Sequence, residues 1–325
     1  MRDSKGMLKL IGKIALFLAI LAVIMLTISK VIGYACMKDD SIVHDRNKSV
    51  YRIAKQPDRT LDMVVLGDSL TYYTFSPMQM YIDYGIAGFV CGQPGQKIQE
   101  SYIMLEHVFE CQSPKLVILE TDNLFMWNEE KKLANIKDTV KEWLKDRFDL
   151  VRSHDTWKSL FVGKEYPEEN YKGLIYNENV TPMENVPYMI ESDETREVLQ
   201  VSKEYAQKIK DLCDEHGAKL LFVSAPSLKD YNYPTHNGAV KYAKELGVPY
   251  LDFNLLNNET GIDWMTDTFD YGDHLNISGA TKVSKYLAKY IKDNYDLPDH
   301  RGEAEYADWD EEAKIYAKRV NGLAK

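Results

Sequence analysis

The chain has 325 residues, of which 45% are hydrophobic and 11% aromatic, and its formal net charge is −10. This length accommodates one large domain or two small ones, and the apolar content excludes a largely disordered protein. Residues 1–38 carry six Lys or Arg and one Asp, a net of +5, so the remainder carries −15. Such an acidic remainder lacks the clustered Lys and Arg that nucleic acid binding requires, and we predict no nucleic acid partner.

The first predicted element is an apolar helix near the N-terminus. No residue between Ile14 and Ser29 is charged, and apolar residues continue after Lys30 as far as Met37. The run is long enough to span a bilayer, which takes about 20 residues. Four basic residues precede it, so we expect a single-pass cell-membrane protein whose N-terminus is cytoplasmic and whose chain after residue 38 is extracellular. A cleaved signal peptide is the alternative, but the run exceeds the usual core of about 7 to 15 residues.

The region after this anchor, residues 39–60, is polar and irregular and is predicted to be a stalk. Residues 61–325 are predicted to form the main domain. Short apolar runs within it are typical of buried strands in a parallel sheet, and helical patterns alternate with them. This alternation predicts an α/β fold, a three-layer α/β/α sandwich with a parallel, flavodoxin-like sheet. The predicted strands are residues 63–66, 86–90, 116–119, 220–223 and 250–253, and the clearest helices are residues 98–109, 197–216 and 278–290.

Residues from about 128 to 195 interrupt the alternation. They are rich in charged, aromatic, Asn and Pro residues and contain no buried strand pattern. We interpret them as an insertion, helical to about residue 150 and rich in loops afterwards, that packs over one end of the sheet. Substrate selection is its expected role, and a purely structural flap is the alternative.

Ser69 lies where the first predicted strand ends, in the series Gly67, Asp68, Ser69 and Leu70. Open parallel sheets bind ligands at the edge formed by the carboxyl ends of their strands. A serine is a weak nucleophile unless a base takes its proton, so a catalytic Ser69 requires a histidine elsewhere. Because Gly-Asp-Ser is also ordinary turn chemistry, the tetrapeptide alone decides nothing.

Two further loops follow predicted strands. Residues 92–96 read Gly-Gln-Pro-Gly-Gln, and a glycine there lets the backbone approach a substrate and donate an N–H to an oxyanion. A plain turn explains the same residues. Residues 120–123 read Glu-Thr-Asp-Asn, where the side chain of Asn123 could add a second donor.

The last loop, before the final predicted helix of the sheet region, contains His274. Asp273 precedes it by one residue and Asp270 by four. A carboxylate that holds the imidazole tautomer makes histidine an effective general base. We favour Asp270 as this acid because Asp273, an immediate neighbour, would have to turn back onto the ring, and Asp273 is the alternative. Helix capping by Asn276 or Ser278 would account for the loop without catalysis.

Taken in chain order, these pieces resemble the SGNH (GDSL-type) hydrolase superfamily over roughly residues 62–292. Its motifs are a Ser in a Gly-Asp-Ser block, a Gly in a second block, an Asn in a third and an Asp-x-x-His block, and Ser69, Gly95 and His274 match them directly. The third block departs from the usual Gly-x-Asn-Asp, and Tyr271 stands where the last block has its Asp. The resemblance implies that Ser69 is the nucleophile, His274 the base, and Ser69, Gly95 and Asn123 the oxyanion donors.

The anchored arrangement is similar to a bacterial cell-surface branch that includes lipoteichoic-acid D-alanyl transfer proteins and polysaccharide or peptidoglycan O-acetyltransferases and esterases. It implies a serine esterase or acyltransferase that transfers acetyl or D-alanyl groups of cell-surface polymers through an acyl-serine. The expected partners are a polysaccharide or teichoic-acid-like polymer and the membrane, with a multi-spanning membrane acyltransferase as a further candidate. The alternatives are an inactive domain that binds glycan or scaffolds such an acyltransferase, and a lipase.

The remaining chemistry that the sequence could support is limited. It contains no Gly-rich phosphate loop and no paired Cys/His metal spacing, so we predict neither a metal nor an organic cofactor. Of the four cysteines, Cys36 lies in the apolar run. Cys91 and Cys111 could pair, but the count excludes a disulfide-built scaffold.

Overall fold

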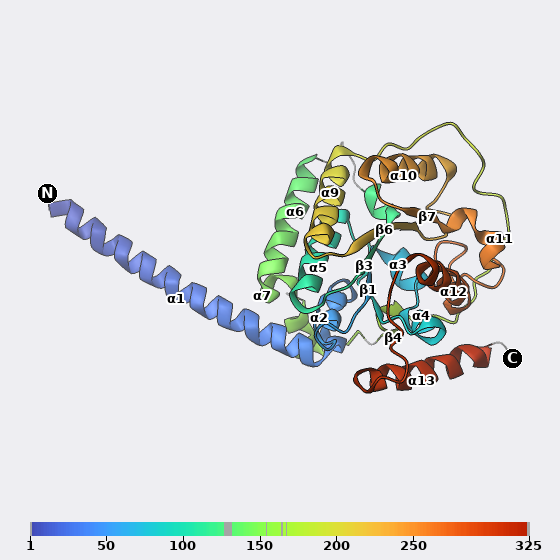
Figure 1. The fold of residues 1–325 in the computed structure, drawn as a ribbon. Coiled ribbons are helices and arrows are strands. Elements are labelled where there is room, and N and C mark those ends of the chain that lie inside the picture. Colours follow the sequence, from blue (N-terminus) through green and yellow to red (C-terminus); the bar gives the residue numbers. More distant parts are fainter. Residues whose placement is uncertain (1, 127–131, 154, 164, 167, 324–325) are drawn as a thin grey trace.

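The central element of the fold is a five-stranded parallel sheet flanked by helices (Figure 1). We analysed a computed structural model, which describes residues 2–126, 132–153, 155–163, 165–166 and 168–323. The strand order is β2-β1-β3-β6-β7. This is the flavodoxin-like order, and it confirms the predicted fold class. The strands are β1 (Met63–Leu66), β2 (Gly88–Val90), β3 (Leu116–Glu120), β6 (Lys219–Ser224) and β7 (Tyr250–Asp252).

The two faces of the sheet carry separate hydrophobic cores. In β1, Val64 and Leu66 belong to one core, and Met63 and Val65 belong to the other. This division follows from the pleat, which turns successive side chains to opposite faces. Because all four of these residues are buried, the strand reads as a continuous apolar run in the sequence.

Helices cover both faces and join the strands. In chain order they are α2 (Lys48–Ala54), α3 (Ser69–Thr74), α4 (Pro77–Tyr84), α5 (Ile98–Cys111), α9 (Gln200–Glu215), α10 (Tyr233–Leu246), α11 (Asn257–Thr260), α12 (Ile277–Asn294) and α13 (Ala307–Leu323). Helix α5 packs beside α9, and α12 packs beside α3 and α4. The three helices predicted at residues 98–109, 197–216 and 278–290 correspond to α5, α9 and α12, although α9 begins only at Gln200 and α12 continues to Asn294.

Helix α1 (Arg2–Lys38) projects away from the domain (Figure 1). Its segment Gly6–Lys38 has a mean hydropathy of 2.6 in its apolar window, and none of that window is buried. By length and composition this helix is able to cross a membrane, a property that it shares with signal sequences.

The segment predicted to be a stalk lies against the domain. Helix α2 buries Lys48, Ser49, Tyr51 and Ile53. The amide of Asn47 donates to the carbonyl of Arg152 at 2.9 Å, which ties this segment to α7 (Asp149–Arg152). Residues 39–60 are therefore not an extended spacer in this structure.

The insertion combines helices, a small hairpin and an extended segment. Its residues 128–131 lie outside the described part of the chain. It contains α6 (Lys132–Arg147), α7, α8 (Thr156–Val162) and the antiparallel strands β4 (Asn170–Tyr171) and β5 (Leu174–Ile175). The hairpin joins the end of β2, where the N–H of Val90 donates to the carbonyl of Lys172 at 2.9 Å. The insertion therefore reaches the sheet edge at which Ser69 lies.

The cysteines form no disulfide in this structure. All four, including Cys91 and Cys111, are free thiols. Burial raises the pKa of the Cys111 thiol above its ordinary value, which lowers its thiolate fraction at neutral pH.

Candidate active site

Ser69 is the first residue of α3, directly after the turn that leaves β1. Asp68 caps this short helix, since its side chain accepts a hydrogen bond from the N–H of Leu70 at 3.0 Å. The cap fixes the turn, and the turn presents the Ser69 hydroxyl at the carboxyl edge of the sheet.

A hydrogen-bonded series joins Ser69 to two residues from the other end of the domain. The Oγ atom of Ser69 lies 2.8 Å from Nε2 of His274, and Nδ1 of His274 lies 2.6 Å from Oδ2 of Asp270. Asp273 is further away, with its Oδ1 at 4.0 Å from the same Nδ1. A proton held on Nδ1 by Asp270 leaves Nε2 free to accept the proton of Ser69. The structure thus places Asp270, and not Asp273, in the position of the orienting acid.

The loop before His274 has a backbone that brings Asp270 back onto the ring. Tyr271 and Gly272 both have positive φ angles, 64° and 85°, which tighten the chain between the two residues. The other carboxylate oxygen of Asp270 accepts from the N–H of His274 at 2.7 Å. The Asp–His spacing is one residue longer than in the motif that the sequence resembles, and this turn takes up the extra residue.

Two aromatic rings hold the imidazole. Phe269 stacks on His274 with an interplanar angle of 17° and a centroid distance of 5.8 Å. Tyr73 meets it edge-on at 5.3 Å. Sequence reasoning missed both residues, although Tyr73 lies one helical turn after Ser69 on the same face of α3.

The loop after β2 lies against the serine turn through Gly92. A Cβ atom at Gly92 would lie 2.9 Å from the carbonyl oxygen of Asp68, so only glycine fits there. Gly95, the predicted oxyanion donor, is exposed and has a φ of 56°. Asn123 is fully buried, and its amide donates to the carbonyl of Gln96 at 2.8 Å. The Asn123 side chain therefore holds the loop after β2 and is not exposed to a substrate.

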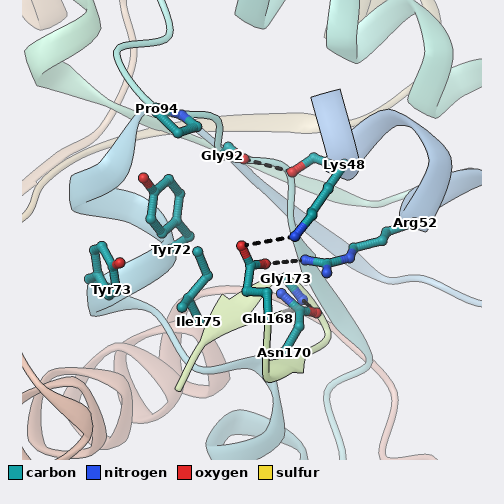
Figure 2. Close-up of a pocket in the computed structure, with 11 residues that line it drawn as sticks. Lys48, Arg52, Tyr72, Tyr73, Gly92, Pro94, Glu168, Asn170, Gly173 and Ile175 are labelled. Atoms are coloured by element: carbon teal, nitrogen blue, oxygen red, sulfur yellow. Dashed lines mark hydrogen bonds and ion pairs between the residues drawn. The ribbon is translucent and has the colours of Figure 1, made fainter. Parts of the chain in front are cut away.

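A polar cavity of about 170 Å³ adjoins the site (Figure 2). Tyr72, Tyr73 and Gly92 form the wall nearest to Ser69. Helix α2 contributes Lys48, Ser49 and Arg52 to the opposite wall, and the insertion contributes Glu168, Asn170, Gly173 and Ile175, of which Ile175 lies beside Tyr72.

Charged groups inside this cavity neutralise one another. Lys48 is only 1% exposed, and its Nζ lies 3.6 Å from Oε2 of Glu168. The guanidinium of Arg52 pairs with the other oxygen of Glu168 and with Asp40. Sequence reasoning missed these residues because their meeting depends on how the insertion packs.

Carboxyl groups surround the site on the sheet side. Burial raises the pKa of Asp68 to about 7, with the charge of Asp122 adding to the effect. Burial also raises the pKa of Asp122 to about 6, although Arg196 acts in the opposite direction. Buried Glu120 has a pKa well above its ordinary value. Because these pKa values are raised, the three carboxyl groups carry less negative charge near neutral pH than exposed carboxyl groups would.

One group of side chains in the described part of the chain could share a cation. Ligand atoms of Asp270, Asp273 and His274 lie within 4.8 Å of one another. Two of these residues belong to the series that contains Ser69. A cation bound there would occupy the imidazole lone pair or the carboxylate that proton transfer by His274 requires. Cation binding and proton transfer from Ser69 therefore exclude each other.

Comparisons with known proteins find likeness only among solved structures. No family model matches the chain, and no curated protein matches it. A candidate platelet activating factor from Streptococcus pneumonia is 12% identical, covers 85% of this chain and 99% of its own, and gives a TM-score of 0.42. A GDSL-like lipase from Bacteroides thetaiotaomicron is 13% identical (72% and 88% covered, TM-score 0.36). A lipase/acylhydrolase from Enterococcus faecalis is 14% identical (73% and 99%, TM-score 0.37). At these scores the likeness carries no weight for function, which therefore rests on the site geometry.

The two aspartates can be separated by matched substitutions. Asp270→Asn keeps an oxygen for the N–H of His274 but cannot accept the Nδ1 proton, so hydrolysis of p-nitrophenyl acetate should fall about 10³- to 10⁴-fold in kcat. Asp273→Asn is the control, and its kcat should fall less than about 10-fold. The Asp273 carboxylate lies 4.0 Å from Nδ1 and acts on the ring only through its charge. Equal losses, or a larger loss in Asp273→Asn, would contradict the assignment of the acid.

Asp122 makes the stability of the protein depend on pH. Because its pKa is about 6 in the folded protein, against 3.8 ordinarily, the folded state binds the proton more tightly. This contribution to stability is complete below about pH 4 and is lost as the pH rises through 6. Asp122→Asn mimics the protonated form. Its effect on the free energy of unfolding should be more stabilising at pH 7.5 than at pH 4, by about 1 to 3 kcal/mol.

Urea unfolding in detergent at the two pH values measures this difference. Asp263→Asn is the control, because a hydrogen bond from Asn185 lowers the pKa of Asp263 and the sign of the pH effect is reversed. If the free energies of unfolding of the parent and of Asp122→Asn changed by the same amount between the two pH values, the pKa of Asp122 would not be raised by folding.

Proposed function

We propose that the chain is an SGNH-type serine esterase or acyltransferase that acts on acetyl or D-alanyl esters of cell-surface polymers. The observation that supports this most strongly is the hydrogen-bonded series from Asp270 through His274 to Ser69. An inactive domain has no need to keep a serine, a base and an acid in this geometry.

In the proposed mechanism, Nε2 of His274 removes the proton of Ser69 while Oγ attacks the carbonyl carbon of the ester. The backbone N–H groups of Ser69, Gly92 and Gly95 are the proposed donors to the oxyanion. The tetrahedral intermediate collapses, and the departing alkoxide takes the proton from Nε2. Water or a polymer hydroxyl then attacks the acyl-serine by the same steps in reverse, and His274 again accepts and returns the proton.

The cavity beside Ser69 favours a small polar group over a fatty chain. Its walls present charged and hydroxyl groups, among them Lys48, Glu168 and Tyr72. An apolar chain would remove water from these groups without replacing the hydrogen bonds. The cavity therefore supports a short acyl group, or a hydroxyl-bearing unit of the acceptor, and speaks against the lipase alternative.

The proposed setting of this reaction is the outer face of a cell membrane. Helix α1 would serve as the anchor, with the basic residues of its first turns on the cytoplasmic side. The acceptor would be a polysaccharide or teichoic-acid-like polymer, and a multi-spanning membrane acyltransferase is a fitting source of acyl groups.

Substitution of Ser69 tests the reaction class. The full chain in detergent should hydrolyse p-nitrophenyl acetate and react with a fluorophosphonate probe, because only an activated serine attacks phosphorus. Ser69→Ala should abolish labelling and reduce kcat by about 10⁴-fold or more. Ser113→Ala, which removes an exposed hydroxyl, should behave like the parent. Labelling that survives in Ser69→Ala would exclude Ser69 as the nucleophile.

The length of the acyl chain tests the substrate class. Between p-nitrophenyl acetate and p-nitrophenyl octanoate, kcat/KM should fall by about 10-fold or more, because the longer chain dehydrates the charged cavity wall. A rise in kcat/KM with chain length would instead support a lipase.

A further inference from the structure

The backbone carbonyl groups of the loop after β2 are held by side chains from outside the loop. The carbonyl of Gly92 accepts a hydrogen bond from the hydroxyl of Ser49 at 2.6 Å. The carbonyl of Pro94 accepts from the guanidinium of Arg46, and that of Gln96 accepts from the amide of Asn123 at 2.8 Å. The three contacts come from three different side chains outside the loop, and together they hold its backbone.

Each contact fixes the peptide unit of the held carbonyl, and with it the direction of the N–H of the residue that follows. No peptide bond in the described chain is cis, and in a trans peptide the N–H points opposite to the carbonyl of the same unit. With the carbonyl of Pro94 held by Arg46, the N–H of Gly95 is directed away from Arg46. Among the described residues, no backbone carbonyl accepts a hydrogen bond from the N–H of Gly92 or of Gly95.

The same loop is fixed against the serine turn. The N–H of Gln93 donates to the carbonyl of Gly67 at 3.2 Å, while the carbonyl of the same peptide unit accepts from Ser49. Both ends of this unit are thus held, one by the serine turn and the other by α2. Loss of the Ser49 hydroxyl would leave a buried carbonyl free to rotate toward water.

Two of these three contacts come from the short segment that follows α1. Ser49 is 8% exposed and lies in the first turn of α2, while Arg46 lies just before that helix. Arg46 also forms an ion pair with buried Glu100, whose carboxylate accepts from the N–H of Lys97 at 2.8 Å at the start of α5. The position of Arg46 is therefore set by the helix into which the loop runs.

We propose that Arg46 and Ser49 are positioning residues for the oxyanion-binding loop: Arg46 aims the N–H of Gly95 at the Ser69 site, and Ser49 keeps the loop, with the N–H of Gly92, against the serine turn. This inference rests on the proposed function. The segment between α1 and the sheet domain then contributes to the active site through Arg46 and Ser49, in addition to connecting the two elements.

The test compares the removal of two buried hydroxyl groups of α2. That of Ser49 contacts the loop, and that of Tyr51 contacts α7. In Ser49→Ala, kcat for p-nitrophenyl acetate should fall about 10- to 100-fold while KM changes less than about 3-fold, as expected when only transition-state contacts are lost. The pH dependence of kcat/KM should keep its midpoint, because His274 and Asp270 are untouched. Ser49→Thr retains the hydroxyl and should recover most of the rate.

The control is Tyr51→Phe, which removes another hydroxyl of α2. That hydroxyl bonds to Asp149 at 2.8 Å and to Ser153, on the side of α7 and away from the loop. Its kcat should match the parent. Arg46→Met provides a second test in case Ser49→Ala folds poorly, and the same loss of kcat at constant KM is expected.

The outcomes separate this inference from the proposed function. A parent-like kcat in folded Ser49→Ala or Arg46→Met, an equal loss in Tyr51→Phe, or no recovery in Ser49→Thr would overturn the positioning role while Ser69 still carried the reaction. A parent protein whose hydrolysis did not depend on Ser69 would instead overturn the proposed function.

Discussion

Parallel pairing of β1 with β2 and with β3 is the constraint on which the site depends. In the register of this sheet Val65 pairs with Val90 and Leu66 with Leu119, so the three strands end at one edge. Each strand then gives that edge one loop: the Ser69 turn, the loop of residues 92–96 and the turn that contains Asn123. The fourth component, the His274 loop, reaches the same edge because α12 packs against α3. Without this register the loops after β2 and β3 would not lie beside Ser69.

Much of this arrangement could be predicted from sequence because local rules apply to it. The buried runs of the parallel strands are continuous and bounded by turn residues, so β1 was placed with its correct limits and β3 within one residue. The weaker run at 86–90 was predicted too long, since only Gly88–Val90 pairs with β1. The choice of Asp270 over Asp273 followed from how neighbouring side chains diverge along a chain, and the structure has the same geometry.

What the sequence could not provide are the contacts made by distant segments. Lys48 and Glu168 are 120 residues apart and meet only because the insertion folds back over the segment after α1. The direction of the Asn123 amide depends on Gln96 and on Ser101, whose hydroxyl donates to its oxygen. Such polar networks follow from tertiary packing, in which no periodicity or spacing marks the partners. For the same reason residues 39–60, polar and irregular in sequence, turned out to be packed.

The packing of the segment after α1 also limits where the protein can work. The last turns of α1 contact α7 directly, and the side chain of Ser29 accepts from the N–H of Leu150 at 3.1 Å. With α1 in a bilayer, the domain would have no flexible tether. A domain of this length has a radius of gyration of about 19 Å. The site could therefore reach only substrates that lie within a short distance of the lipid surface. If the acceptor is the proposed polymer, it would be modified close to its membrane-attached end, or while it emerges from the membrane, and its distal parts would stay out of reach.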